Sequence, residues 1–137
     1  MNVLDAALYS RLQTAGSITS LLSGTTAIYK GQAPEGSTLP YIVFSFPSDL
    51  DANETPRRRK DDIMFIRAFA TGSNGAAIAG SIDDQIDTAV HLVPLTVSGW
   101  TNIWLAREQG LETVETTPTG AMIFMRGANY RAILNNS

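Results

Sequence analysis

His91 is the single histidine in this chain, and it is the first residue to consider for catalysis. A general base needs a nucleophile or a group that grips the substrate, and no Gly-x-Ser-x-Gly motif is present. A common zinc site is excluded as well, because the chain has no cysteine and no second histidine. His91 falls at the predicted end of a helix, where the helix dipole favours a cationic side chain. Capping therefore explains His91 better than catalysis, and the sequence predicts no enzyme.

Asp83, Asp84 and Asp87 form the densest acidic cluster. Asp83 and Asp87 share a helix face, but calcium takes six or more oxygen ligands from a shaped loop, and no EF-hand pattern is present. The cluster is predicted to be a solvated helix face, or a negative surface for a channel or a partner. The segment that contains Gly72 and Gly75 has no lysine at the position that a phosphate-binding loop requires. We therefore expect no metal and no cofactor.

The basic run Arg57 to Lys60 is the strongest charge feature of the chain. Acidic residues flank the run on both sides and no aromatic residues are interleaved for base stacking, so nucleic-acid binding is disfavoured. The remaining readings are a solvated loop tip or a docking site for an acidic surface of a neighbouring subunit, which arginine suits because its planar fork binds carboxylates. The candidate interface residues are Arg57, Arg58, Arg59, Lys60, Asp49, Asp51 and Glu54.

The composition fits one soluble domain that makes contacts with other proteins. The 137 residues are 44% hydrophobic and only 17% charged, with a net charge of -3. So few charges leave uncharged surface, which favours burial against copies or partners. A dedicated duplex binder is usually basic, and this chain is not. No signal peptide and no membrane span are predicted, so synthesis and assembly are expected in the cytosol.

Apolar periodicity predicts the elements that position these residues. Leu4, Leu8 and Leu12 indicate a helix over 2–14, and Ile82 and Ile86 mark the apolar face of a second helix over 76–90. A short helical turn follows Ser17. Strands are predicted over 27–29, 41–46, 63–70, 100–108 and 122–134, with polar turns between them that include 113–120.

The order of these elements predicts an α+β fold. We expect an antiparallel sheet of four to five strands, with the two main helices packed on one face. Residues 1–137 are predicted to form a single domain. The segment 47–62 has no apolar periodicity and is predicted to be a long exposed loop between two strands, a length that is usually functional or disordered.

A turn with two glycines and two prolines joins the first two predicted strands, over 28–44. Together with the leading helix, the strand over 65–70 and the closing segment 126–131, it resembles the tail terminator (tail completion) proteins of long-tailed bacteriophages. The residues that carry the pattern at the turn are Tyr29, Gly31, Ala33, Pro34, Leu39, Pro40 and Tyr41.

The resemblance implies a virion structural protein. Members of this family form a hexameric ring at the head-proximal end of the phage tail tube, the tail–head junction, after assembly in the host cytoplasm. The ring stops tube growth and docks to the head connector. The implied partners are further copies of the chain, the major tail tube protein and a head completion or connector protein, with transient passage of DNA through the lumen and no membrane contact.

Three other readings stay open. The chain could be another neck or tail-tube subunit of the virion, which open-ended tubes in place of rings would indicate. A small ligand-binding or enzymatic α+β domain would need a pocket that contains His91 and two carboxylates. A nucleic-acid-binding accessory protein would show a steep salt-dependent affinity for duplex DNA.

Overall fold

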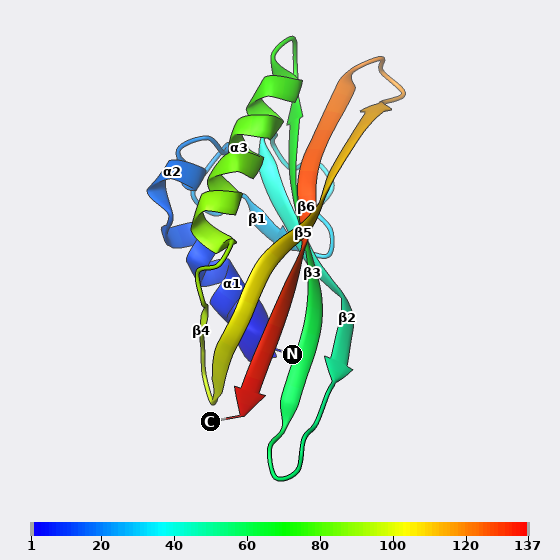
Figure 1. Ribbon diagram of the computed structural model, residues 1–137. Helices are drawn as coiled ribbons and strands as arrows, with labels where there is room; N and C mark the ends of the chain where they lie inside the picture. The colour runs from blue at the N-terminus through cyan, green and yellow to red at the C-terminus, as the bar shows by residue number, and fades with distance from the viewer. Residues whose placement is uncertain (1, 137) are drawn as a thin grey trace.

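The computed structural model describes residues 2–136, which form three helices and one six-stranded sheet (Figure 1). The sheet order is β1-β2-β3-β6-β5-β4. The helices are α1 (Asn2–Thr14), α2 (Gly16–Thr19) and α3 (Gly75–Val90). The strands are β1 (Ile28–Lys30), β2 (Tyr41–Asp51), β3 (Arg59–Thr71), β4 (Thr96–Val97), β5 (Trp100–Thr116) and β6 (Met122–Asn136).

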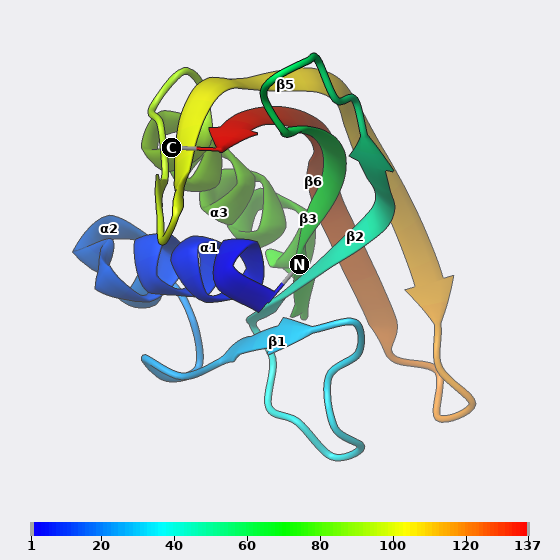
Figure 2. The same cartoon turned by 90° about the horizontal axis from the view of Figure 1, so that it is seen from below.

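The sheet curls around the helices, so that α1 and α3 lie within its concave side (Figure 2). Leu4, Leu8 and Leu12 of α1 are fully buried, as are Ile82 and Ile86 of α3. They pack in one core with alternate residues of the central strands. The i, i+4 spacing places these side chains on one helix face, and their burial supplies the hydrophobic stabilisation of the fold. The predicted α+β class and the two main helices are confirmed.

Two details of the predicted sheet are wrong. The sheet has six strands, and β1 pairs with β2 in parallel, with Ile28 opposite Ile42 and Lys30 opposite Phe44. The chain therefore returns along residues 31–40 before β2 starts, and Gly31 and Gly36 adopt positive φ angles on this path. The two-residue strand β4, which pairs with the start of β5, was not predicted because two residues carry no periodicity.

The predicted loop over 47–62 is too wide. β2 continues to Asp51 and β3 begins at Arg59, so that only residues 52–58 connect them. Asp49 pairs with Asp62 and Asp51 with Lys60 in the antiparallel register. Oppositely charged side chains on neighbouring strands can form ion pairs that stabilise the sheet. This end of the hairpin can therefore form strands without alternating apolar residues. We call residues 50–58 the tip.

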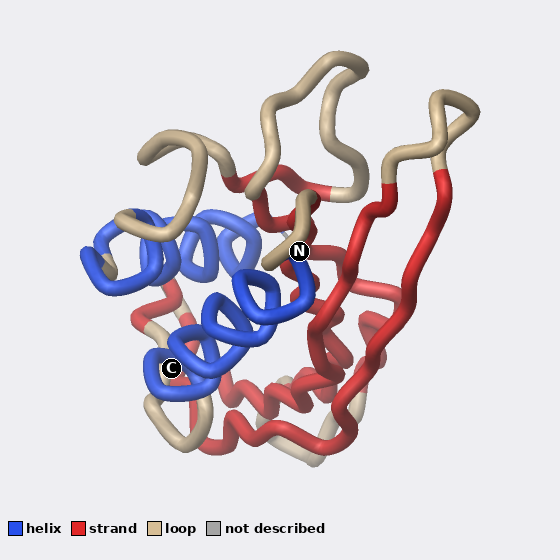
Figure 3. Tube along the Cα trace, turned by 90° about the horizontal axis from the view of Figure 1, so that it is seen from above, coloured by secondary structure: helices blue, strands red, loops and turns tan. Residues whose placement is uncertain are grey.

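The hairpin of β5 and β6 is also longer than predicted. β5 runs on to Thr116, through residues that the sequence placed in a strand only as far as 108 and in a turn from 113. The end of this hairpin, residues 116–122, extends past Thr71, the last residue of β3, and Figure 3 shows the hairpin leading away from the helices. We call residues 108–126 the arm. The tip and the arm lie at opposite ends of the molecule (Figure 1).

Arg11 connects α1 to the end of α3. Its guanidinium donates hydrogen bonds to the carbonyl oxygens of Ala89, Val93 and Pro94 at 3.0, 3.1 and 2.8 Å. The last carbonyls of a helix lack partners within the helix, and a cation at this position also complements the helix dipole. The sequence predicted that His91 caps the end of this helix. In the structure, Arg11 of α1 donates the hydrogen bonds to these carbonyls.

Candidate assembly surfaces

Cross-strand ion pairs hold the end of the β2–β3 hairpin. Lys60 contacts the carboxylates of Asp49 and Asp51 at 3.0 and 3.1 Å, and Arg59 contacts Glu54 at 2.8 Å. The Lys60 side chain is mostly buried. Bonding to the two aspartates raises the pKa of Lys60, with Asp49 the stronger influence. Arg59 and Lys60, predicted as interface residues, are therefore engaged in ion pairs within the hairpin itself.

Arg57 and Arg58 are the basic residues that project from the tip. Arg57 makes no ion pair with any described residue, and Arg58 reaches Asp51 only at 3.9 Å. The Arg58 guanidinium also lies 5.9 Å from the centre of the Trp100 ring, at the start of β5. Exposed cations in this arrangement contribute little to the fold. They are available for contact with another molecule.

Asp62 is a fully buried carboxyl group at the base of this hairpin, opposite Asp49. Burial raises the pKa of Asp62 to about 7, and the neighbouring Asp49 carboxylate adds to the rise. Asp49 shows the opposite shift, a lowered pKa, because its carboxylate interacts with the Asp62 carboxyl group. Two carboxylates close together resist full ionisation, so the neighbouring Asp49 opposes loss of the proton from Asp62.

Replacing Asp62 by asparagine is expected to stabilise the fold at alkaline pH. The native pKa of Asp62 lies above its ordinary value of 3.8, so the native state loses stability as the pH rises from about 4 to about 7. Asparagine removes this penalty, and the gain at pH 8 is expected to be about 1–2 kcal/mol. Thermal unfolding at pH 4 and pH 8 measures it. Equal melting-temperature shifts at both pH values would contradict the assignment.

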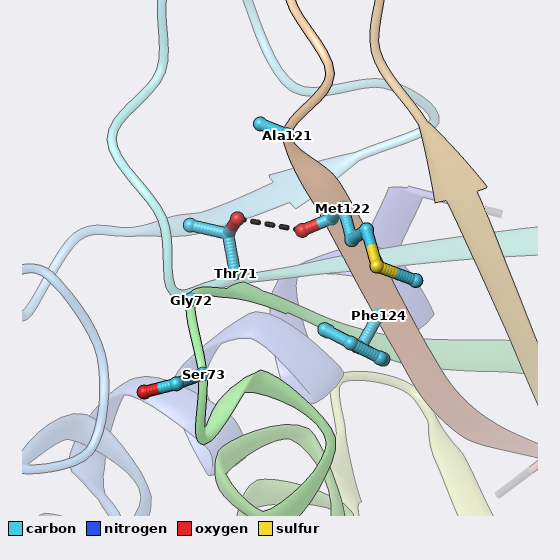
Figure 4. Close-up of a pocket in the computed structure, with 6 residues that line it drawn as sticks. All are labelled: Thr71, Gly72, Ser73, Ala121, Met122 and Phe124. Carbon is cyan, nitrogen blue, oxygen red and sulfur yellow. Dashed lines mark hydrogen bonds between the residues drawn. The ribbon is translucent and has the colours of Figure 1, made fainter.

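The arm carries exposed apolar residues on the side that faces the helices. Val114 and Met122 are 49% and 47% exposed. Beside Met122, a cavity of about 430 Å³ opens between the arm and the loop before α3 (Figure 4). The Thr71 hydroxyl closes its base by donating a 2.6 Å hydrogen bond to the Met122 carbonyl. The lining residues are Thr71, Gly72, Ser73, Ala121, Met122 and Phe124.

The arm is acidic and has one open edge. Glu108, Glu112 and Glu115 are all exposed, while Arg126 is its one basic residue. Glu112 reaches Arg126 only at 3.8 Å, and Glu115 makes no ion pair with a described residue. Beyond Leu105, no described strand pairs with the outer edge of β5. An edge of this kind is a common site of association between proteins.

The residues of the Gly/Pro turn make ring contacts and backbone hydrogen bonds with the strands around it. Tyr41 makes an edge contact with Tyr29, with ring centres 5.8 Å apart, and a tilted contact with Phe69 at 5.4 Å. Gly31 has φ of 77° and its N–H donates to the Phe44 carbonyl at 2.8 Å. Ala33, Pro34 and Leu39 lie on the connecting loop, which enters β2 through Pro40. Leu39–Pro40 is a cis peptide bond.

The structure places His91 as the sequence predicted, but not the acidic residue Asp83. His91 lies at the end of α3, as predicted, and its Nδ1 accepts a 2.9 Å hydrogen bond from the Arg107 N–H. Asp83 is buried and paired with the Arg107 guanidinium at 2.9 and 3.2 Å, so this part of the predicted solvated face is wrong. Among residues 2–136, no group of acidic, histidine or cysteine side chains is arranged to hold a metal ion.

The exposed arm residues Val114 and Met122 were not predicted. A signal for the hairpin was present: Thr117-Pro118-Thr119-Gly120 is a turn, and it stands between a Thr/Val-containing segment and the run Met-Ile-Phe-Met. Such a pattern is typical of a hairpin. The sequence carries no signal that these two side chains are exposed, because valine and methionine are often found in hydrophobic cores.

The class defined by this fold is an α+β domain whose most prominent surface features are two long hairpins at opposite ends of a curled sheet. The chain belongs to the tail completion protein gp17 family, whose profile matches residues 6–134. It is therefore a structural protein of a virion tail. The matched range includes the core, the tip and the arm.

Solved structures share the fold. One, from the virion of a native gene transfer agent particle, superposes with a TM-score of 0.74 at 18% identity, covering 97% of this chain and 95% of that one. A second, which carries no descriptive name, has a TM-score of 0.56 at 14% identity and covers 96% and 94%. A comparison with curated protein sequences found no significant match.

Membrane insertion through a helix is not a feature of the described part of the chain. None of the helices within residues 2–136 is both long and apolar enough to cross a membrane.

Proposed function

We propose that this protein is the tail terminator of a phage-like particle. It forms a hexameric ring at the head-proximal end of the tail tube, stops tube growth and docks to the head connector, while DNA passes through the ring. The observation that carries this proposal is the family match over residues 6–134, since it spans every element from α1 to β6. No bond is made or broken in this role.

The surface of the chain supports ring formation. A ring needs two different, mutually complementary patches on each subunit, because each copy contacts its neighbours through unlike surfaces. The tip and the arm are two such features at opposite ends of the molecule (Figure 1). A net charge of -3 also suits a conduit for DNA, since a basic lumen would retain the duplex.

The ring is expected to face the tube on one side and the connector on the other. The proposed partners are therefore further copies of this chain, the major tail tube protein and a head completion or connector protein. Assembly would take place in the host cytoplasm, and the mature location is the junction of tail and head.

Purified protein mixed with polymerising tube protein tests the proposal. Electron microscopy is expected to show single six-fold rings alone, and tubes of reduced length capped at one end in the mixture. Open-ended tubes made by the protein itself would favour the alternative, a tail-tube subunit. A ring that leaves tube growth unchanged would indicate another level of the neck.

Replacing Arg57, Arg58 and Arg59 by alanine is expected to weaken assembly without unfolding the monomer. Arg57 and Arg58 project from the tip, and Arg59 pairs only with the exposed Glu54. Exposed ion pairs contribute at most about 1 kcal/mol to stability. Sedimentation measures assembly, and circular dichroism measures folding. Unchanged ring formation by the folded variant would refute a docking role for these residues.

A small ligand-binding domain has less support. None of the four cavities found among the described residues has His91 in its lining, and the largest is lined by small, hydroxyl and apolar side chains. The cavity that contains Asp83 and Glu112 also contains Arg107 and Arg126, with which these carboxylates pair.

A further inference from the structure

The two ends of the molecule differ in charge. At the tip, Glu54 is paired with Arg59, which leaves the positive charges of Arg57 and Arg58 largely uncompensated. At the arm, three glutamates stand against the single arginine Arg126. Arg57 and Glu115 each lack an ion pair within the described chain. The tip is formally neutral and presents Arg57 as an unpaired cation, whereas the arm carries a net negative charge.

The two ends also share exposed apolar surface. Leu50, at the start of the tip, is 58% exposed, although it stands on a strand. Val114 and Met122 on the arm are exposed, and Met122 lines a cavity of about 430 Å³ that is open to solvent (Figure 4). That volume accommodates an inserted leucine side chain. Exposed apolar groups at a rim of opposite charges are typical of protein interfaces.

We propose that the tip of one copy binds the arm of the next copy, with Leu50 packed against Val114 and Met122 and with Arg57 paired to Glu115. The inference rests on the proposed function, since it names the contact that closes the ring. The occupant of the arm is a second copy, because the same chain supplies both the complementary charge and the exposed leucine.

This contact is of the head-to-tail kind. The tip and the arm are different surfaces, so a copy that binds through its tip still presents a free arm, and the chain of contacts continues until it closes. The open outer edge of β5 and the length of the arm allow the contact to extend over several residues. Charge pairing at the rim directs the approach and excludes tip-to-tip and arm-to-arm pairs, since like charges repel.

Two charge reversals, Arg57→Glu and Glu115→Arg, test the contact. Neither residue has an ion pair with any of residues 2–136, so both variants are expected to fold with an unchanged melting temperature. Each alone is expected to raise the protein concentration needed for half-assembly by about tenfold or more. Mixed in equal amounts, the two variants are expected to assemble again, because each tip then finds an arm of opposite charge in an alternating ring. Native mass spectrometry reads out all three samples.

A second pair of variants tests the apolar part. Leu50→Ser is expected to weaken assembly by a similar factor, while Leu21→Ser, at an exposed leucine after α2, leaves it unchanged. The absence of cysteine from the chain permits a direct check: Arg57→Cys with Glu115→Cys is expected to give a ladder of disulfide-linked oligomers, and Arg57→Cys with Glu35→Cys is not.

The outcomes separate this contact from the proposed function. If folded Arg57→Glu and Glu115→Arg variants assemble like the wild type, or if mixing them does not restore assembly, the tip-to-arm contact is wrong while the terminator ring stands. If the wild-type protein neither oligomerises nor stops tube growth, the proposed function fails and the contact fails with it.

Discussion

Replacing Arg107 by alanine is expected to lower the free energy of unfolding by about 3–5 kcal/mol. Arg107, on β5, donates two hydrogen bonds to the carboxylate of Asp83 on α3, at 2.9 and 3.2 Å. The Asp83 side chain is only 3% exposed, so the variant would leave a buried charge without its partner. Bonding to Asp83 also raises the pKa of Arg107.

Two controls isolate this effect. Asp83→Asn in the Arg107→Ala background removes the orphaned charge and is expected to recover much of the loss. Arg126→Ala removes a loose surface pair, 3.8 Å from Glu112, and is expected to change stability by less than about 0.5 kcal/mol. Urea unfolding below the assembly concentration measures all three. A loss below 1 kcal/mol for Arg107→Ala would contradict the account of this pair.

Replacing Gly127 by alanine is expected to cost about 3 kcal/mol or more, or to prevent folding. Gly127 lies in β6 opposite Arg67 of β3. An added Cβ would overlap the carbonyl oxygen of Ile66 and lie 2.8 Å from the Cα atom of Arg67. These are backbone atoms in the centre of the sheet, so the strands would have to separate to accommodate the methyl group.

Gly24 supplies the matched control, because an added Cβ there meets no atom within 4 Å. Gly24→Ala is expected to leave stability within about 1 kcal/mol of the wild type. Thermal unfolding compares the two variants. If Gly127→Ala unfolded at the same temperature as Gly24→Ala, the close approach of β6 to β3 would be refuted.

The sequence predicted the helices and the core because their patterns are local. Leu4, Leu8 and Leu12 recur at helical spacing, and all are buried. The outer parts of the hairpins escaped prediction because their stability comes from pairing across strands. One example is Lys60, whose ion pairs with Asp49 and Asp51 stabilise paired strands in a segment without alternating apolar residues.

The candidate assembly surfaces were predicted in part. The basic run was recognised as exposed, which is correct for Arg57 and Arg58 and wrong for Lys60, whose side chain is 13% exposed. The exposure of Leu50, Val114 and Met122 was not predicted, because the type of an apolar residue does not tell whether its side chain is buried or exposed. Only the folded sheet shows which of them face solvent.

The buried contacts stabilise the fold, whereas the hairpins are proposed to mediate assembly. Asp83 with Arg107 and Gly127 against β3 keep the helices and the sheet in one arrangement. The tip and the arm lie at opposite ends of the molecule (Figure 1), and the charged and apolar side chains proposed for assembly are exposed there. Damage to the first set is expected to unfold the protein, whereas damage to the second set is expected to leave a folded monomer.

Tail length in particles made without this protein tests the central claim most directly. Electron microscopy of such particles is expected to show tubes of unregulated length with no heads attached, and supply of the wild-type chain is expected to restore tails of one length joined to heads. Tails of normal length, joined to heads in its absence, would contradict the claim.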